Sequence, residues 1–179
     1  MIYFTKLWIV IIKSTISGKE SNDSMIQYKI ATTEDIAELM TIRLEMLREV
    51  NILSKDYPFS EDFCSYSREY FLKGNHTTVL AVDGEDEKSI GCATLCYMEF
   101  MPTFSHPTGK RAHLMNVYTS PDYRGQGIAR RMVEMLIEEA RRRGITEISL
   151  DATTSGRPLY RKLGFRDSEE CMVLVGRDK

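Results

Sequence analysis

Two glycines precede a long amphipathic segment and three arginines flank its start. Together they predict an anion-binding site. The segment runs from Ile128 to Arg143 at helical spacing, with Gly125 and Gly127 before it. Backbone N–H groups in the first turn of a helix have no partner within the helix, and the helix dipole is positive there. Glycine lets a ligand approach these N–H groups closely, so phosphate is the expected occupant. Three side chains add charged donors nearby: Arg124, Arg130 and Arg131.

The familiar nucleotide-binding patterns fit this stretch poorly. The pattern G-x-G-x-x-G requires a third glycine where Arg130 stands, and the pattern G-x-x-x-x-G-K-[ST] is absent. A nucleotide-dependent oxidoreductase would also need an acidic residue about 20 residues after the turn. Glu147 falls near that place, so an oxidoreductase is kept as an alternative that the missing glycine disfavours.

Two motifs instead point to one known family. The run Arg124-Gly125-Gln126-Gly127-Ile128-Ala129, with its strand-like lead-in, closely resembles the acetyl-coenzyme A loop of GCN5-related N-acetyltransferases. A second motif downstream, Tyr-x-x-x-Gly-Phe, resembles a motif of the same enzymes and is formed here by Tyr160, Gly164 and Phe165. The pattern spans nearly the whole chain from Met25 to Val175.

This resemblance implies acetyl-CoA as co-substrate and a primary amine of a small molecule or peptide as acceptor, with direct attack in a ternary complex. A non-catalytic acyl-CoA sensor would use the same pocket and remains a second alternative. One position departs from the family, where Thr153 replaces a frequent coenzyme-binding Asn. The coenzyme-binding residues that the resemblance implies are Val117, Tyr118, Thr119, Arg124, Gly125, Gln126, Gly127, Ile128, Ala129, Arg130 and Thr153.

Acyl transfer from a thioester to an amine needs a neutral amine, a donor for the developing oxyanion and a proton for the thiolate. Tyr160 is the predicted acid, since a phenol can protonate a thiolate held beside it. The base stays open between Glu99, Asn116 and His113. Strict alternation would place residues 114, 116 and 118 on one face of their strand.

Hydrophobic periodicity gives the predicted order β-α-α-β-β-β-α-β-α-β-β, an α/β protein whose mixed sheet has helices on both faces. The expected strands are 26–31, 77–82, 90–100, 111–119 and 146–150, with a closing pair at 165–166 and 171–175. The expected helices end at Val50, Lys73, Arg143 and Leu163.

The first two helices have contrasting apolar patterns. Ile36, Leu39, Met40, Leu44 and Leu47 recur at helical spacing in the first. Phe63, Tyr66, Tyr70 and Phe71 form an aromatic stripe in the second. The stripe is expected to belong to the core, and the alternative is that it forms a wall of the acceptor pocket. The acceptor is expected between these helices and the loop 101–110, where acidic side chains would attract a cationic amine. Those acids are Glu45, Glu49, Asp56, Glu61 and Asp62.

Length and charge suit one domain. The chain has 179 residues and a net charge of -2, so neither nucleic acid nor a membrane surface is an expected partner. Residues 1–24 read as an apolar extension and linker, and 25–179 as the N-acetyltransferase domain. The four cysteines and three histidines lack metal-binding spacing. No metal is therefore expected, and the cysteine usage predicts a reduced, cytoplasmic setting, with a homodimer among the expected assemblies.

Overall fold

The structure, a computed structural model, describes residues 26–168, and its elements follow the predicted order as far as the last helix. The predicted strand at 165–166 does not form, and 171–175 and the extension 1–24 lie outside the described residues. The elements are β1 (Ile26–Ile30), α1 (Ile36–Val50), α2 (Glu61–Lys73), β2 (His76–Asp83), β3 (Ser89–Glu99), β4 (Lys110–Thr119), α3 (Ile128–Arg142), β5 (Glu147–Leu150) and α4 (Arg157–Lys162).

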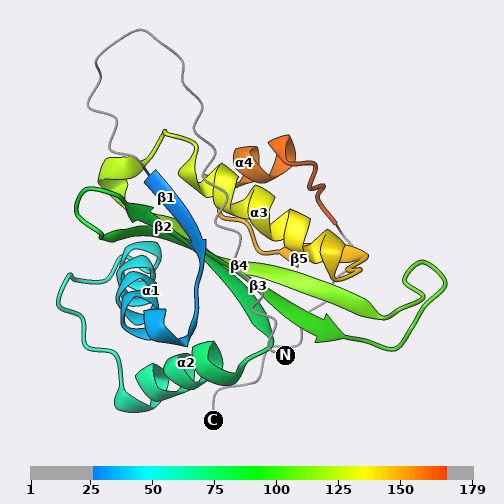
Figure 1. Cartoon of the computed structure of the whole chain (residues 1–179), viewed down its shortest axis with the longest axis horizontal. Helices are drawn as coiled ribbons and strands as arrows, with labels where there is room; N and C mark the ends of the chain where they lie inside the picture. The colour runs from blue at the N-terminus through cyan, green and yellow to red at the C-terminus, as the bar shows by residue number, and fades with distance from the viewer. Residues whose placement is uncertain (1–25, 169–179) are drawn as a thin grey trace, which may run out of the picture.

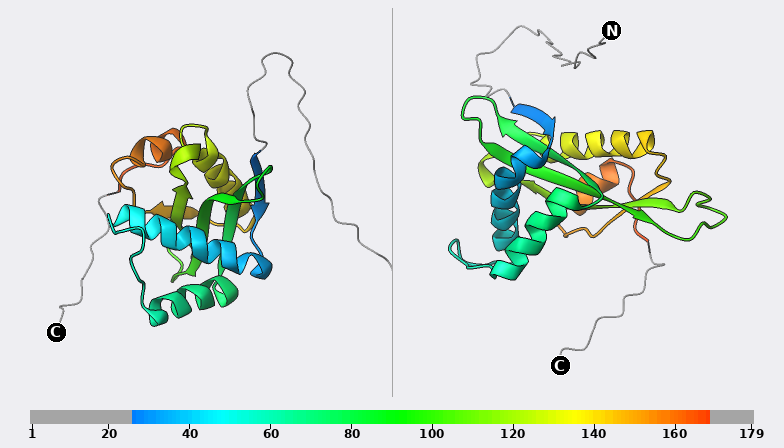
Figure 2. Two further views of the ribbon diagram at one scale, coloured as in Figure 1. Left: turned by 90° about the vertical axis from the view of Figure 1, so that its left-hand side faces the viewer. Right: turned by 60° about the horizontal axis from the view of Figure 1, so that its bottom comes forward.

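The five strands form one mixed sheet in the order β1-β2-β3-β4-β5. Neighbouring strands are antiparallel except β4 and β5, which run parallel because α3 connects them. Helices α1 and α2 lie on one face of the sheet, and α3 and α4 lie on the other (Figures 1 and 2). The predicted mixed sheet with helices on both faces is confirmed.

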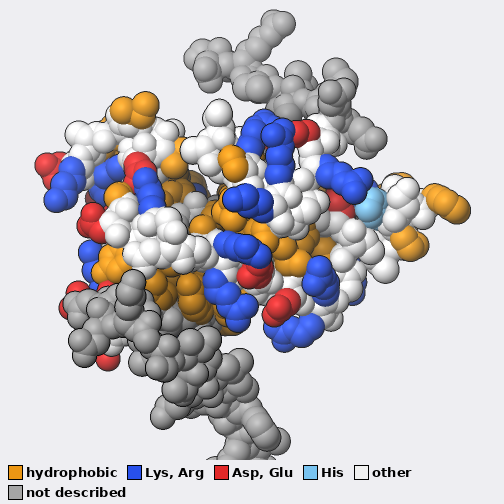
Figure 3. All heavy atoms as spheres, turned by 90° about the horizontal axis from the view of Figure 1, so that it is seen from above, with side chains coloured by type: hydrophobic (Ala, Val, Ile, Leu, Met, Phe, Trp, Pro, Cys, Tyr) orange, Lys and Arg blue, Asp and Glu red, His pale blue; other side chains and the backbone are white. Residues whose placement is uncertain are grey.

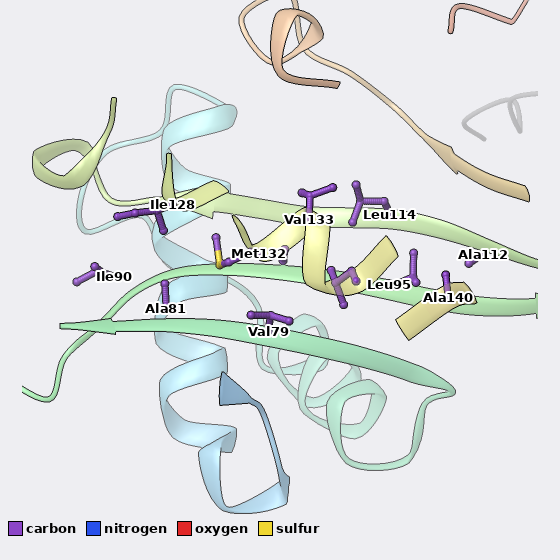
Figure 4. Packing of buried hydrophobic residues seen from close by; sticks show 12 residues of the cluster. Val79, Ala81, Ile90, Leu95, Ala112, Leu114, Ile128, Met132, Val133 and Ala140 are labelled. Carbon is purple, nitrogen blue, oxygen red and sulfur yellow. The ribbon is translucent and has the colours of Figure 1, made fainter. Parts of the chain in front are cut away.

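Helix α3 packs the larger core against the sheet. Its buried residues recur at helical spacing and contact apolar side chains from β2, β3 and β4 (Figure 4). Burial of this stripe fixes the direction of α3, and therefore the place where its amino end meets the end of β4. The buried residues of α3 are Ile128, Met132, Val133, Leu136 and Ala140.

Helix α1 packs a smaller core on the opposite face. Leu39, Ile42 and Met46 contact Cys92 of β3 and Tyr118 of β4. The expected stripe along α1 is confirmed at Leu39 and Met40, which are buried, whereas Leu44 and Leu47 are only half-buried. The buried line therefore follows residues 39, 42 and 46 instead.

The aromatic stripe of α2 belongs to the core only in part: Phe71 packs against the α1 core as predicted, whereas the tyrosines do not. Tyr66 is 71% exposed and Tyr70 is 42% exposed, while Phe63 and Phe71 are half-buried. Ser67 is the buried residue of α2. The helix thus presents a polar side chain toward α1, because its partner there is an arginine, Arg43.

A β-bulge in β4 overturns the predicted alternation of its side chains. Two residues, Asn116 and Val117, stand opposite the single Ala93 of β3, and Asn116 has a φ of 56°. Leu114 consequently faces the α3 core, whereas Tyr118 faces the α1 core. The extra residue shifts the side-chain alternation by one, so residues 114 and 118 lie on opposite faces.

Within residues 26–168, none of the helices combines the length and the apolar character that crossing a bilayer requires.

Removing side-chain volume from the α3 core should unfold the protein at lower denaturant concentration. Leu136 is 1% exposed, and Leu136→Ala is expected to lower the free energy of unfolding by about 2–5 kcal/mol. Leu72→Ala makes the same chemical change at a side chain that is 43% exposed, and should cost less than about 1 kcal/mol. Equal losses in urea denaturation would contradict the assignment of the core.

Candidate active site

The amino end of α3 carries a row of unpaired backbone donors. Arg131 is the first residue there whose N–H bonds to a helix carbonyl, that of Gly127 at 3.0 Å. Within the described residues, the N–H groups from Gly125 to Arg130 have no acceptor. A ligand with several acceptor oxygens is the natural partner for such a row.

The sequence omits the groups that normally neutralise a helix start. Gly127 occupies the cap position of α3 without a side chain to accept a hydrogen bond, and the first turn holds no acidic residue. By contrast, α2 begins with Ser60, whose hydroxyl accepts from the Phe63 N–H, followed by Glu61 and Asp62. The positive end of the α3 dipole is therefore uncompensated and favours an anion.

The two glycines of the turn are required by the backbone and leave its surface open. Gly125 and Gly127 have φ angles of 80° and 82°, in the left-handed region that disfavours other residues. A Cβ built on either would meet no protein atom within 4 Å. This open space lies directly over the unpaired N–H groups, where a ligand would need it.

Two of the arginines beside the turn, Arg124 and Arg130, form ion pairs with glutamates. The Arg124 guanidinium lies 2.5 Å from the Glu49 carboxylate of α1 and donates to the Thr119 carbonyl at 2.9 Å. Arg130 pairs with Glu134 one turn later on α3. Arg124 therefore fastens the turn to α1, and its backbone rather than its guanidinium is what the turn offers to a ligand.

Arginine and lysine side chains nevertheless gather on the face of the molecule that α3 and α4 form (Figure 3). Such a field would attract a polyanionic ligand toward the turn. The exposed cationic side chains of the two helices are Arg130, Arg131, Arg141, Arg142, Arg157, Arg161 and Lys162.

Strand β5 pairs along its whole length with the first half of β4 only. The last pair in the register joins Leu114 to Leu150, so the β5-facing edge of β4 has no strand partner among the described residues from Met115 to Thr119. An edge of this kind offers main-chain donors and acceptors to an extended ligand. The predicted residues Val117, Tyr118 and Thr119 all lie on this unpaired stretch.

The side chains of these three residues point in different directions. Val117 packs against the α3 core. The Tyr118 ring is buried on the α1 face, where burial raises the pKa of its phenol. The Thr119 hydroxyl is buried without a hydrogen-bond partner in the described residues. In the same way, the Ile128 side chain is buried, so Ile128 can offer a ligand only its backbone.

Tyr160 lies on α4 with its phenol free. The ring is half-buried, packs edge-to-face on Phe165 at 5.9 Å, and its hydroxyl has no hydrogen-bond partner among the described residues. Burial raises the pKa of Tyr160, so the phenol stays protonated at neutral pH and can donate a proton. Tyr160 also lines a groove of about 1280 Å³ between β5, α4 and the loop after β3.

Thr153 is occupied by its own turn. Its hydroxyl accepts from the Gly156 N–H at 3.2 Å and lies 3.2 Å from the Ser155 hydroxyl. The side chain therefore closes the turn that leads into α4, and a contact between Thr153 and the coenzyme stays a prediction.

Asn116 is placed at the bulge and both ends of its amide are engaged. Its oxygen accepts from Arg43 of α1 at 3.1 Å, and its nitrogen donates to the Cys92 sulfur at 3.3 Å. These contacts hold the bulge open and make Asn116 a positioning residue. The sequence patterns do not single out Arg43, because a cation between apolar positions of a helix carries no motif.

The other predicted bases lie away from the unpaired stretch of β4. Glu99 is exposed and pairs with Lys110 at the start of β4, which is roughly 23 Å along the strand from Val117. His113 lies between them, with its ring nitrogens near Ser149 and Asp151 of the β5 region. The structure therefore does not bring Glu99 to the unpaired stretch of β4.

Glu147, which the oxidoreductase alternative requires near the glycines, lies at the wrong end of the sheet. It opens β5 beside Arg111, whereas the glycine turn follows the far end of β4. A ribose bound to a ligand on the turn could not reach it. Among the residues that the structure describes, no cluster of three potential metal ligands occurs.

The expected acceptor region is divided by the fold. Figures 1 and 2 place the loop 101–109 at the far tip of the β3–β4 hairpin, away from α1 and α2. That loop and the first two helices therefore do not enclose one pocket. Arg43 and Ser67 connect α1 and α2 to the bulge of β4 instead.

Comparison with known proteins agrees with this geometry. Residues 44–165 match the Acetyltransferase (GNAT) family. A solved structure of a predicted acetyltransferase with acetyl-CoA from Clostridium acetobutylicum is 31% identical, with a TM-score of 0.73 over 84% of this chain and 96% of that one.

Two curated relatives are similar over part of the chain. Glucosamine 6-phosphate N-acetyltransferase of Trypanosoma brucei brucei is 33% identical over 48% of this chain and 56% of the relative. Thialysine N-epsilon-acetyltransferase of Sus scrofa is 30% identical over 51% of this chain and 54% of the relative. The chain thus spans about half the length of these curated relatives. Because the family match covers more than half of the sequence, the chain belongs to the GNAT family of acetyltransferases.

Proposed function

We propose that this chain is an N-acetyltransferase that moves an acetyl group from acetyl-CoA to a primary amine of a small molecule or peptide, by direct attack in a ternary complex. The observation that carries the proposal is the uncapped amino end of α3 beside the unpaired half of β4. A diphosphate suits the first feature, and an extended pantetheine arm suits the second.

The N–H groups of Gly125 to Ala129 would hold the coenzyme phosphates, and the free edge of β4 from Met115 to Thr119 would align the arm. Acetyl-CoA, when bound, supplies the acetyl group as an activated thioester. A backbone N–H near Val117 is suited to stabilise negative charge on the carbonyl oxygen. These residues fix the reacting carbon within reach of an amine approaching past α1 and α2.

The proton balance of the transfer requires an acid, and the proposal gives that role to Tyr160. The amine loses its proton to water as the new C–N bond forms, and the C–S bond breaks. Tyr160 then donates its phenolic proton to the sulfur and regains one from solvent. Its raised pKa keeps that proton in place until the thiolate needs it. The relatives named above acetylate amines according to their names, which supports an amine acceptor here.

Gly127→Glu should abolish coenzyme A binding. The new carboxylate would stand among the unpaired N–H groups and repel phosphate. The matched control is Gly144→Glu, because Gly144 also has a left-handed φ (69°) and an open Cβ position, but lies at the other end of α3. Both variants bear similar backbone strain.

Isothermal titration calorimetry with coenzyme A measures the difference. The dissociation constant is expected to rise at least about 100-fold in Gly127→Glu, because this variant loses several charge-assisted hydrogen bonds between backbone N–H groups and phosphate. In Gly144→Glu it should rise less than about 3-fold, because those hydrogen bonds remain. Equal affinity in the two variants would place the coenzyme elsewhere.

Tyr160→Phe should lower kcat by about 10²-fold or more while leaving coenzyme A affinity unchanged. Tyr97→Phe is the matched control, since the Tyr97 hydroxyl bonds to Thr77 at 2.8 Å on the same face of the sheet. That control should lower stability by about 1 kcal/mol without lowering kcat. Thiol release from acetyl-CoA reports kcat, and full activity in Tyr160→Phe would remove the acid role.

A further inference from the structure

Arg43 occupies an unusual place on the acceptor side of the sheet. The side chain is half-buried on α1, and its Nη1 donates to Asn116 at the bulge of β4 over 3.1 Å. Its Nε lies 3.5 Å from the Ser67 hydroxyl, and its guanidinium carbon lies 5.8 Å from the centre of the Phe63 ring. Arg43 therefore lies where α1, α2 and the bulge of β4 meet.

No carboxylate neutralises this guanidinium. Among the described residues no acidic side chain lies within ion-pair distance of Arg43, whereas Arg111 pairs with Glu147 and Arg124 pairs with Glu49. Burial lowers the pKa of Arg43, although an arginine remains charged at neutral pH. A half-buried cation without a counter-ion costs stability, and a bound anion would offset that cost.

The guanidinium also has donors to spare. Its Nη2 makes no hydrogen bond within residues 26–168 and is not among the buried polar atoms that lack partners, so Nη2 is not sealed from solvent. Nε and Nη1 are directed at neutral oxygen atoms of Ser67 and Asn116. The planar fork suits the paired oxygens of a carboxylate or phosphate, and the Phe63 ring beside it helps to hold the fork in place.

The coenzyme does not account for this site. Its proposed phosphate site opens α3, on the face of the sheet opposite the α1 core. Arg43 also lies nearly two turns of α1 before Glu49, the residue that contacts the glycine turn through Arg124. The separation is roughly 9 Å along the helix axis. The anion that Arg43 lacks should therefore come from the other substrate.

We propose that Arg43 binds an anionic group, a carboxylate or a phosphate, on the same small molecule that presents the accepting amine. This inference rests on the proposed function and narrows its acceptor to amino acids and amino phosphates. The anionic group would sit on the Arg43 fork beside Asn116, and the amine would reach the thioester along the adjacent stretch of β4. Arg43 thus selects the acceptor without taking part in proton transfer.

The experiment compares acceptors that differ only in the anionic group. The pairs are lysine with lysinamide, and glucosamine 6-phosphate with glucosamine. Thiol release gives kcat/KM, and calorimetry on the coenzyme A complex gives acceptor affinity independently of turnover. The wild-type protein should favour the anionic member of at least one pair by about 10-fold or more. The preferred pair distinguishes a carboxylate from a phosphate.

Arg43→Gln should remove that preference by raising KM and the dissociation constant of the anionic member alone. The neutral member of each pair and coenzyme A report any general effect of losing the Arg43–Asn116 hydrogen bond. Arg43→Lys keeps the charge and should retain part of the preference, which guards against loss of folding in the first variant. Arg68→Gln is the matched control, because Arg68 is exposed on α2 and has no partner among the described residues. It should behave as wild type.

Two outcomes would overturn the inference: no wild-type preference within either pair, or a preference that Arg43→Gln retains. These outcomes differ from failure of the proposed function. A protein that binds coenzyme A and acetylates the neutral amines without discrimination keeps its function and loses this inference. A protein that binds the anionic compounds through Arg43 without releasing thiol keeps the inference and loses the proposed activity.

Discussion

The central feature of the structure is the row of backbone N–H groups at the amino end of α3, which have no hydrogen-bond acceptors among the described residues. A helix start is normally closed by a capping side chain and acidic residues, as at α2. At α3 two left-handed glycines replace those groups and keep the surface clear. The apolar stripe of α3 holds this end in position, because burial against the sheet leaves the helix no freedom to turn. The core packing thus fixes the position of the proposed anion site.

The bulge in β4 links this anion site to the opposite face of the sheet. Asn116 adopts a left-handed φ and is held there by Arg43 and Cys92. The bulge lies just beyond the last β4–β5 pair. In the proposed function, the same short stretch would therefore offer main-chain groups to one substrate and border the surface that receives the other. Glu49 and Arg124 make a second connection, from α1 to the glycine turn. Two substrates can therefore meet at one strand.

The sequence predicted the fold and the glycine turn because both follow from local patterns. Hydrophobic periodicity located the strands and helices through α4, and the spacing of Gly125 and Gly127 located the open helix start. The acceptor side was not predictable in the same way. A bulge at Asn116 shifts the side-chain alternation without any local signature, and the pairing of Arg43 with Ser67 depends on how α1 and α2 pack. Such contacts arise from tertiary structure, which periodicity does not encode.

The most direct test of the account is hydrogen–deuterium exchange of individual amides, followed by NMR with and without saturating coenzyme A. Unpaired amides exchange quickly, and bonding to phosphate should slow them. The account predicts that the amides from Gly125 to Ala129 slow at least about 10-fold on binding. The amide of Gly144, which bonds to the Arg141 carbonyl at the other end of α3, should not change. Coenzyme A binding that left exchange from Gly125 to Ala129 unaltered would contradict it.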